Sequence, residues 1–295
     1  MNLSIEFRQK VRLALLEGRA NYGGTDGDFA KKCAINKAIF SRIKSGETED
    51  ILSNSQWLTL GREYNVALKT DTWKIARTEV YNNIEANLQF CQQYSKSMIM
   101  VDDCGIGKTF CSKHILRSMK NAFYIDCSQA KTKQQFVRLI AKTVGVDSQG
   151  RYADMKANLK YFINMMDKPL IVLDEAGDLE YNAFLEVKEL WNATTGTCAW
   201  YMMGADGLRN KIERGINSKR VGFKEIFSRF SDEYIQLVPT GHLEKQTFYA
   251  NLIGDVATVN NVSKEDTDKL VRQCLKKEAT LRYLETLIKI KQSNQ

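Results

Sequence analysis

Proline is scarce in this sequence, and long apolar runs are missing from it. Pro169 and Pro239 are the only prolines in 295 residues, which excludes long proline-rich linkers. No apolar run approaches the roughly 20 residues that span a bilayer. The segment 1–12 mixes both charges and lacks the apolar stretch and cleavage site of a secretory signal. We therefore expect a cytoplasmic protein with no membrane partner.

Closely spaced cysteine pairs are missing as well. The seven cysteines are an odd number, and none of them forms a Cys-x-x-Cys pair. This pattern argues against a disulfide framework and against a zinc site. We expect reduced thiols.

Positive charge is in excess. The chain has 43 Lys and Arg against 35 Asp and Glu, which gives a net charge of +8 and a pI near 9.0. Such a charge favours a polyanionic partner such as nucleic acid. A basic enzyme without a polyanionic partner would have the same composition, so charge alone leaves both readings open.

Three blocks follow one another along the chain. Residues 1–70 are predicted to form short helices, residues 71–239 alternate apolar strands with amphipathic helices, and residues 240–295 are predicted to be helical only. Alternating strands and helices predict an α/β fold with a parallel sheet and helices on both faces. Ligands of such sheets bind beyond the carboxyl ends of the strands. The expected strands are residues 97–102, 122–126, 168–174, 197–203 and 233–238.

The loop after the first expected strand carries the strongest motif. Gly107, Lys108 and Thr109 end a Gly-x-x-x-x-Gly-Lys-Thr pattern whose first glycine is replaced by Asp102. Successive loop amides and the positive end of the following helix can hold a phosphate. The expected nucleotide-binding residues are Cys104, Gly105, Ile106, Gly107, Lys108 and Thr109. The alternative is a helix that begins with Gly-Lys-Thr by chance.

The same loop suggests how ATP and Mg²⁺ are held. We expect Lys108 to reach the β- and γ-phosphates of ATP and the Thr109 hydroxyl to ligate Mg²⁺. Asp102 and Asp103 would repel a triphosphate unless they point away from it or meet a cation. We expect such repulsion to lower the affinity for ATP rather than to abolish ATP binding.

A second acidic pair ends the third expected strand. Residues 170–173 are apolar and are followed by Asp174 and Glu175. We expect Asp174 to hold Mg²⁺ through its water shell and Glu175 to act as the general base that takes a proton from the attacking water. The alternative is a helix cap or surface turn after a core strand.

Together these residues resemble the AAA+ ATPase family. The loop 105–109, the pair Asp174–Glu175 and a strand at 198–203 occur in that family's order. The resemblance covers residues 71–295. It implies a P-loop sheet of strand order 5-1-4-3-2, a small C-terminal helical lid at 240–295, and ATP held between subunits of a homo-oligomer.

The same resemblance suggests three further site residues. Asp206, beyond the fourth expected strand, corresponds to the sensor 1 position. Arg229, before the fifth, corresponds to the arginine finger that completes a neighbour's ATP site. Arg282 corresponds to the lid's sensor 2 arginine. The alternative for each of the two arginines is an ordinary surface position on a helix.

The N-terminal block resembles a helix-turn-helix of the lambda-repressor type. Residues 28–33 are expected to form one helix, 34–35 a turn and 36–43 the second helix, which in such modules enters the major groove. Asn36 suits an N-cap and Gly46 a helix stop. Phe40 is among the positions expected to be exposed on the second helix. The expected DNA-contacting residues are Lys37, Ser41, Arg42 and Lys44. The alternative is a small helical bundle that contacts protein.

A repressor-like module before an AAA+ core resembles transposon target-capture ATPases of the phage Mu B type. The resemblance implies a helical filament on double-stranded DNA, without strong sequence preference, that delivers the DNA to a transposase. Basic residues after the second strand would approach the DNA backbone, here Lys131, Lys133 and Arg151. Their alternative is a solvated helix start. A replication initiator or helicase loader and an ATP-switched transcription regulator remain competing functions.

Overall fold

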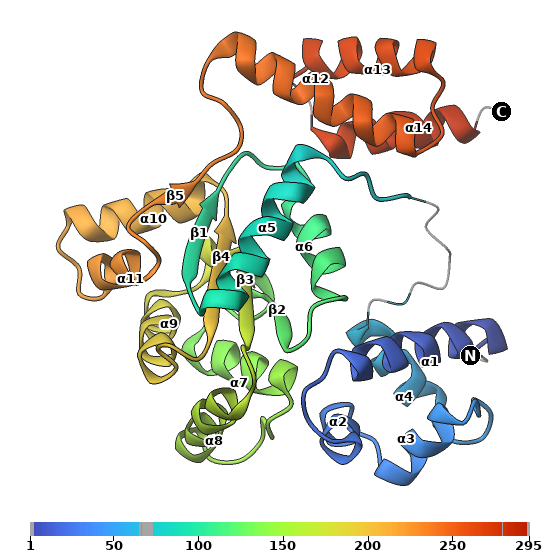
Figure 1. The fold of residues 1–295 in the computed structure, drawn as a ribbon, viewed down its shortest axis with the longest axis vertical. Coiled ribbons are helices and arrows are strands. Elements are labelled where there is room, and N and C mark those ends of the chain that lie inside the picture. Colours follow the sequence, from blue (N-terminus) through green and yellow to red (C-terminus); the bar gives the residue numbers. More distant parts are fainter. Residues whose placement is uncertain (1–2, 65, 67–72, 279, 294–295) are drawn as a thin grey trace.

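The computed structural model describes residues 3–64, 66, 73–278 and 280–293. A helical N-terminal part, a central sheet flanked by helices and a C-terminal group of helices follow one another along the chain (Figure 1). The N-terminal helices are α1 (Ile5–Ala20), α2 (Asp26–Lys32), α3 (Lys37–Lys44) and α4 (Asn54–Glu63). The boundary predicted near residue 70 lies outside the described residues.

The central sheet has five parallel strands in the order β2-β3-β4-β1-β5. This confirms the predicted α/β fold and its strand order 5-1-4-3-2. The strands are β1 (Ser97–Val101), β2 (Ala122–Asp126), β3 (Leu170–Asp174), β4 (Ala199–Gly204) and β5 (Tyr234–Ile235).

Strand β5 is shorter than the predicted residues 233–238. Beyond Ile235 the amides of Leu237 and Val238 donate to the Asp102 carboxylate, at 2.6 and 3.2 Å, rather than to the backbone of β1. Asp102 therefore binds the chain segment that follows the last strand.

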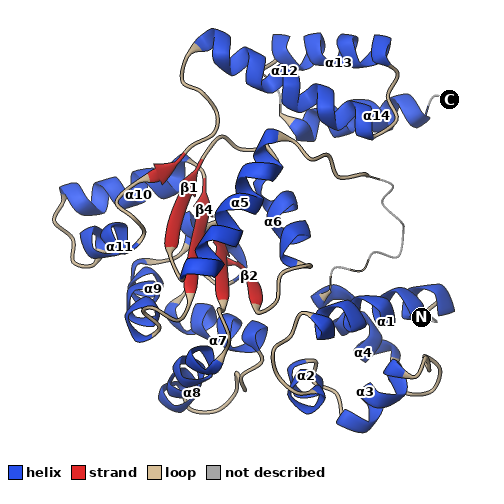
Figure 2. Cartoon of the chain, in the orientation of Figure 1, coloured by secondary structure: helices blue, strands red, loops and turns tan. Residues whose placement is uncertain are grey.

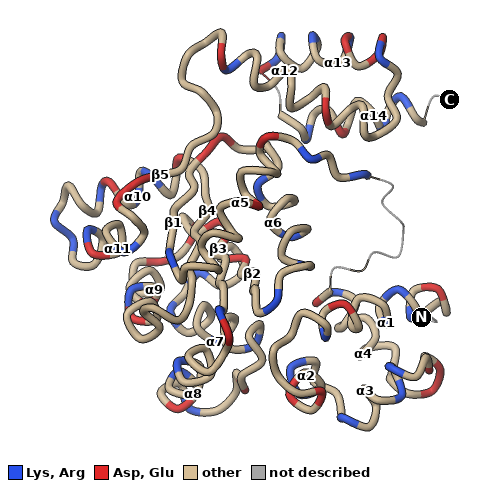
Figure 3. Tube along the Cα trace, in the orientation of Figure 1, with Lys and Arg blue, Asp and Glu red and all other residues tan. Residues whose placement is uncertain are grey.

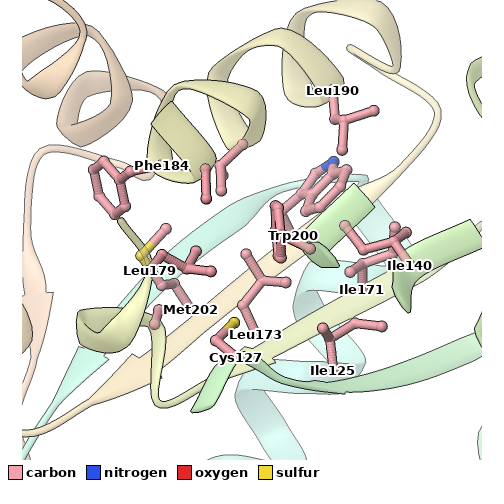
Figure 4. Close-up of a cluster of buried hydrophobic side chains, with 14 of the residues drawn as sticks. Ile125, Cys127, Ile140, Ile171, Leu173, Leu179, Phe184, Leu190, Trp200 and Met202 are labelled. Carbon is pink, nitrogen blue, oxygen red and sulfur yellow. The ribbon is translucent and has the colours of Figure 1, made fainter. Parts of the chain in front are cut away.

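Helices cover both faces of the sheet (Figure 2). All five residues of β3 are buried, as expected for a strand between two helical layers. On the face shown in Figure 4, Trp200 of β4 lies near Ile171 of β3 and Ile140 of the adjacent helix. One face carries α5 (Glu79–Tyr94) and α6 (Lys108–Leu116), and the other carries α7 (Lys133–Val144), α9 (Tyr181–Ala193), α10 (Asp206–Asn217) and α11 (Phe223–Arg229). Helix α8 (Tyr152–Met165), which the sequence analysis did not assign, packs beside α7.

The N-terminal part has two short helices, α2 and α3, where the sequence predicts them. Thr25 forms a capping box with Asp28 at the start of α2, and the Asn36 side chain caps α3 by accepting from the amide of Ala38 at 2.8 Å. The expectation that Phe40 is exposed was wrong. Its side chain is buried in the core of this part, where its ring lies 5.2 Å from that of Phe29. An aromatic side chain on a short helix is more stable in that small core than in water.

The N-terminal part rests against the sheet domain. The amide of Asn121, just before β2, donates to the Asn21 carbonyl at 2.9 Å. Lys142 of α7 pairs with Glu63 of α4 at 2.6 Å, and the ammonium of Lys32 lies 5.2 Å from the centre of the Phe123 ring. These contacts leave the exposed residues of α3 free of the sheet domain.

Within the described residues three helices form the C-terminal part, which the sequence predicts to be helical and which we call the lid. They share a buried core to which each helix contributes side chains, among them Ile253, Cys274 and Leu284. Ala76, from the segment before α5, joins the same core. The helices are α12 (His242–Val259), α13 (Lys264–Lys276) and α14 (Leu281–Ser293). Among the described residues, no helix combines the length and apolarity needed to cross a membrane.

Replacing Asp102 by alanine should destabilise the fold. The change would leave the amides of Leu237 and Val238 without their buried acceptor. We expect the free energy of unfolding in urea to fall by about 2–3 kcal/mol. Asp268→Ala, at an exposed position of α13, is the matched control and should change it by less than about 0.5 kcal/mol. Equal stability of the two variants would contradict this role of Asp102.

Candidate nucleotide-binding site

The phosphate-loop motif lies between β1 and α6. Gly105 and Gly107 have positive φ angles of 76° and 101°, a conformation that glycine adopts without steric cost. Within the part of the chain that the structure describes, the backbone amides of residues 105–109 donate no hydrogen bond to another protein group. Five successive free donors at the start of a helix form an anion-binding loop.

Lys108 folds back over this loop. Its ammonium donates to the carbonyls of Asp102 and Asp103 at 2.8 and 2.7 Å. Burial lowers its pKa, while nearby carboxylates act in the opposite direction. A buried cation beside unpaired amides makes this loop a strong site for a multiply charged anion.

Thr109 and Asp174 meet at the end of β3. The Thr109 hydroxyl donates to the Asp174 carboxylate at 2.6 Å, which joins the predicted phosphate loop to the predicted acidic pair. The hydroxyl of Tyr124, on β2, donates to the same carboxylate oxygen at 2.6 Å. Sequence reasoning missed Tyr124, although a tyrosine in a half-buried strand signals a hydroxyl in need of a partner.

Glu175 follows Asp174 in a left-handed backbone conformation with φ of 51°. Such a conformation is unfavourable for a residue with a side chain and is frequent at functional sites. Partial burial raises the pKa of the Glu175 carboxyl, and the charges of Asp174 and Asp178 raise it further. A raised pKa suits a carboxylate that accepts a proton near neutral pH.

A cavity of about 280 Å³ lies over the loop. The segment 73–76 and Thr78, before α5, form one wall, and Leu281 and Arg282 of the lid belong to the wall as well. Glu175 also lines the cavity. The wall before α5 was not assigned to the site from the sequence, because its place depends on how the lid packs.

The lid touches the loop directly. The amide of Leu281 donates to the carbonyl of Gly105 at 3.2 Å. A Cβ atom at position 105 would lie 2.6 Å from the Thr280 side chain, so this approach requires glycine. Helix α14 thus begins, at Leu281, in contact with the phosphate loop.

Asp102 and Asp103 do not face the cavity. Asp102 is engaged with the chain after β5, and Asp103 accepts from Tyr249 at 2.8 Å and pairs with Lys245 at 2.7 Å, both on α12. Neither carboxylate belongs to the cavity wall. The sequence raised the question of repulsion between these carboxylates and a triphosphate. Both carboxylates point away from the cavity, and Asp103 also meets the cation of Lys245.

The oxygen atoms around Thr109 suit Mg²⁺. A hydroxyl and a carboxylate beside a phosphate site are the hard ligands that this ion prefers, with waters and substrate oxygens completing its shell. Asp174 is 2% exposed and is held by two hydroxyl donors, so its position is fixed. No cluster of three or more His, Cys, Asp or Glu residues that could hold a metal occurs in the described ranges. Because Mg²⁺ in proteins is usually held by one or two carboxylates together with waters and substrate phosphates, Thr109 and Asp174 fit a metal that is bound together with its nucleotide.

The other residues expected near ATP lie at different distances from the cavity. Arg282 lines it, whereas Asp206 is exposed at the start of α10 and does not. Arg229 is held within its own chain, where its guanidinium donates to the Asn192 side chain at 2.7 Å and to the Glu225 carbonyl at 2.8 Å. Action on a neighbouring subunit would require Arg229 to leave these partners.

The expected DNA contacts fall into two groups. On α3, Lys37 and Ser41 are exposed, and Arg42 and Lys44 are exposed but pair with Glu47 and Asp26, both at 2.7 Å. After β2, two of the three expected cations are already neutralised by the chain itself. These pairs are Lys131 with Asp178 at 2.9 Å and Lys133 with Glu186 at 2.8 Å, whereas Arg151 is exposed before α8.

Residues 75–212 match a family model described as an AAA domain. The chain has the AAA+ P-loop fold. The matched stretch runs from the segment before α5 into α10 and so contains the phosphate loop and the end of β3. No curated protein matches the sequence.

Among solved structures, the chain is similar to the Aeropyrum pernix ORC1 protein in complex with DNA, with a TM-score of 0.53 and 12% identity over 75% of this chain and 61% of that one. It is also similar to the Aeropyrum pernix ORC2 protein, solved as ADPNP–ADP complexes, with a TM-score of 0.47 and 12% identity over 71% and 59%. This chain thus spans about three fifths of the length of each. At such identity the likeness to ORC1 concerns the fold.

Tyr124→Phe should weaken the response of ATP turnover to Mg²⁺. Loss of the hydroxyl removes one of the three donors to the Asp174 carboxylate, the others being the Thr109 hydroxyl and the Glu175 amide. Changes to groups that orient a metal ligand typically cost 10–100-fold in metal affinity or activity, so we expect at least about tenfold more Mg²⁺ for half-maximal turnover. Saturating Mg²⁺ should restore most of the rate.

Tyr201→Phe is the matched control, because Tyr201 is a buried strand tyrosine whose hydroxyl contacts Asn87 instead. It should leave the Mg²⁺ titration unchanged. A Tyr124→Phe protein with the same Mg²⁺ dependence as this control would show that Tyr124 does not position Asp174.

Proposed function

We propose that this protein is a DNA-binding ATPase that oligomerises on double-stranded DNA and delivers it to a transposase. One observation carries the ATPase part: five free amides at the start of α6 lie beside the Thr109–Asp174 hydrogen bond. The loop can bind phosphates, and the adjoining carboxylates can serve a metal and a water. The AAA domain match supports nucleotide hydrolysis.

The proposed reaction uses the residues in distinct roles. The amides of residues 105–109 and the ammonium of Lys108 bind the phosphates once the ammonium exchanges its carbonyl partners for phosphate oxygens. Glu175 accepts a proton from the water that attacks the γ-phosphate. Mg²⁺, held by Thr109 and Asp174, would supply charge neutralisation on the phosphate oxygens when bound.

Neighbouring subunits and the lid complete the proposal. Arg282, on the cavity wall, would contact the phosphates from the lid. Arg229 would act on the ATP of an adjacent subunit after release from Asn192. Asp206 is proposed as the polar sensor beyond β4, although its exposed position makes it dependent on an ordered water or a bound nucleotide.

DNA binding is proposed from charge and shape. The chain is basic, and Lys37, Ser41, Arg42 and Lys44 lie exposed on α3, a short helix that follows a tight turn. Lysine, arginine and serine side chains contact phosphates and base edges. Transfer to a transposase rests on the resemblance to target-capture ATPases alone.

A replication initiator or helicase loader is the second candidate. It is favoured by the fold likeness to the ORC1 protein, whose structure contains DNA. The two candidates share the ATPase site and the DNA partner and differ in what they recruit. Binding of purified protein on DNA to a transposase or to a replicative helicase distinguishes them.

Lys108→Ala should abolish ATP binding, as measured by isothermal titration, because it removes the cation of the phosphate loop.

Glu175→Gln should keep ATP affinity within about threefold and reduce turnover by at least about 100-fold, as expected on loss of a general base. Isothermal titration and phosphate release measure the two properties separately. Normal turnover in the Glu175→Gln protein would exclude Glu175 as the base.

The rate should also depend on pH through Glu175. A base must be ionised, and the pKa of Glu175 is raised in the folded protein. The rate should therefore fall, as pH decreases, at a higher pH than an ordinary glutamate would give. A profile of kcat against pH that stays flat down to the usual glutamate range contradicts this assignment.

Electron microscopy with duplex DNA tests the function as a whole. With ATP we expect ordered oligomers along DNA of unrelated sequences, and with ADP their loss. The Glu175→Gln protein should give longer-lived assemblies than the wild type. A protein that stays monomeric on DNA with ATP would overturn the proposal.

A further inference from the structure

The turn that joins α10 to α11 concentrates positive charge. Residues 207–224 contain six Lys and Arg and a single acidic residue, Glu213, a net charge of +5 in a chain whose total is +8. Figure 3 shows these cations along α10 and α11, at the opposite edge of the molecule from α3. Positive charge is therefore concentrated between Asp206 and Glu225.

Two of the six cations have structural roles. Arg209 donates to the Gln236 side chain at 2.9 Å, and Lys211 donates to the carbonyls of Gly177 and Leu179. The remaining four, which we call the basic turn, are all exposed and comprise Arg214, Lys219, Arg220 and Lys224.

The charges of the basic turn are not neutralised within the subunit. In the described part of the chain, the charged groups of Arg214, Lys219 and Lys224 make no hydrogen bond or ion pair. The Arg220 guanidinium lies 3.6 Å from the centre of the Tyr181 ring, a contact that leaves its donors available. Glu225, which follows Lys224 in the sequence, pairs with Lys188 at 3.1 Å.

The backbone of the basic turn is rigidly held. Phe223 stacks between the rings of Tyr181 and Phe184, with centroid distances of 5.9 and 5.1 Å. The Tyr181 hydroxyl donates to the Val221 carbonyl at 3.0 Å. At Gly215 an added Cβ would lie 2.2 Å from the Phe223 ring, so the helix and the turn pack as closely as glycine permits. A fixed backbone presents the four cations in a constant arrangement.

We infer that the basic turn is a contact for the phosphate backbone of duplex DNA, separate from α3. This assignment rests on the proposed DNA-binding function and specifies its second surface. Clustered, unpaired and exposed Lys and Arg side chains are what backbone contacts require, and they bind without sequence preference. Lys131 and Lys133, expected from the sequence to serve this purpose, are already paired with carboxylates. The basic turn does not line the nucleotide cavity, so its charge is not used by the subunit's own ATP.

Salt-dependent DNA binding tests the assignment. The probe is a fluorescein-labelled duplex of random sequence, and anisotropy is measured for the full chain with a non-hydrolysable ATP analogue. For the triple variant Arg214→Gln, Lys219→Gln, Lys224→Gln we expect at least about tenfold weaker binding. The slope of log K against log salt should decrease by about 2 to 3, since each lost phosphate contact removes roughly 0.9.

The control carries the same charge change on exposed, unpaired cations of the lid, Lys264→Gln, Arg272→Gln and Lys276→Gln. It should bind DNA within about twofold of the wild type. The charge-preserving variant Lys219→Arg, Lys224→Arg should bind normally. Thermal unfolding verifies that all variants are folded.

Two results would overturn the assignment alone. One is a wild type that binds DNA and a triple variant that matches the lid control. The other is a triple variant with normal DNA affinity but lost ATP turnover or self-association, which would make the basic turn a contact between subunits. A wild type that does not bind DNA overturns the proposed function together with this assignment.

Discussion

The hydrogen bond between Thr109 and Asp174 is the contact on which the site depends. It joins the start of α6 to the end of β3, two segments 65 residues apart in sequence. The strand order brings them together, because β1 and β3 both flank β4 and end at the same edge of the sheet. The buried side chains of Val101 and Leu173, near the carboxyl ends of β1 and β3, belong to one apolar core that keeps these strand ends in place. A core built from ordinary hydrophobic contacts thus sets the position of a carboxylate that is almost fully buried.

The two aspartates before the phosphate loop, Asp102 and Asp103, accept hydrogen bonds from other parts of the chain. Asp102 binds the segment after β5, and Asp103 binds α12, so the residues before the phosphate loop connect the sheet to the lid. A glycine in place of Asp102, as in the usual motif, would not make this connection. The departure from the motif therefore has a structural reason.

Sequence reasoning predicted the features that depend on local pattern. The phosphate loop and the apolar strand before Asp174 follow from a short motif and from the pattern of apolar residues, and the structure contains both. The strand order came from the family resemblance and is confirmed. Features that depend on contacts between distant residues were missed. Tyr124 is 50 residues from Asp174, and nothing in the sequence signals that pairing.

The contact of Leu281 with Gly105 has a consequence for nucleotide exchange. The lid contacts the loop that is proposed to bind phosphate, and Lys245 and Tyr249 of α12 bind the carboxylate of Asp103, just before that loop. A lid that swings outward must pull on this backbone or break three polar contacts at once. In the proposed ATPase, entry and departure of nucleotide would depend on these contacts between the sheet domain and the lid, so mutations within the lid core, far from the phosphates, would alter how long a nucleotide stays.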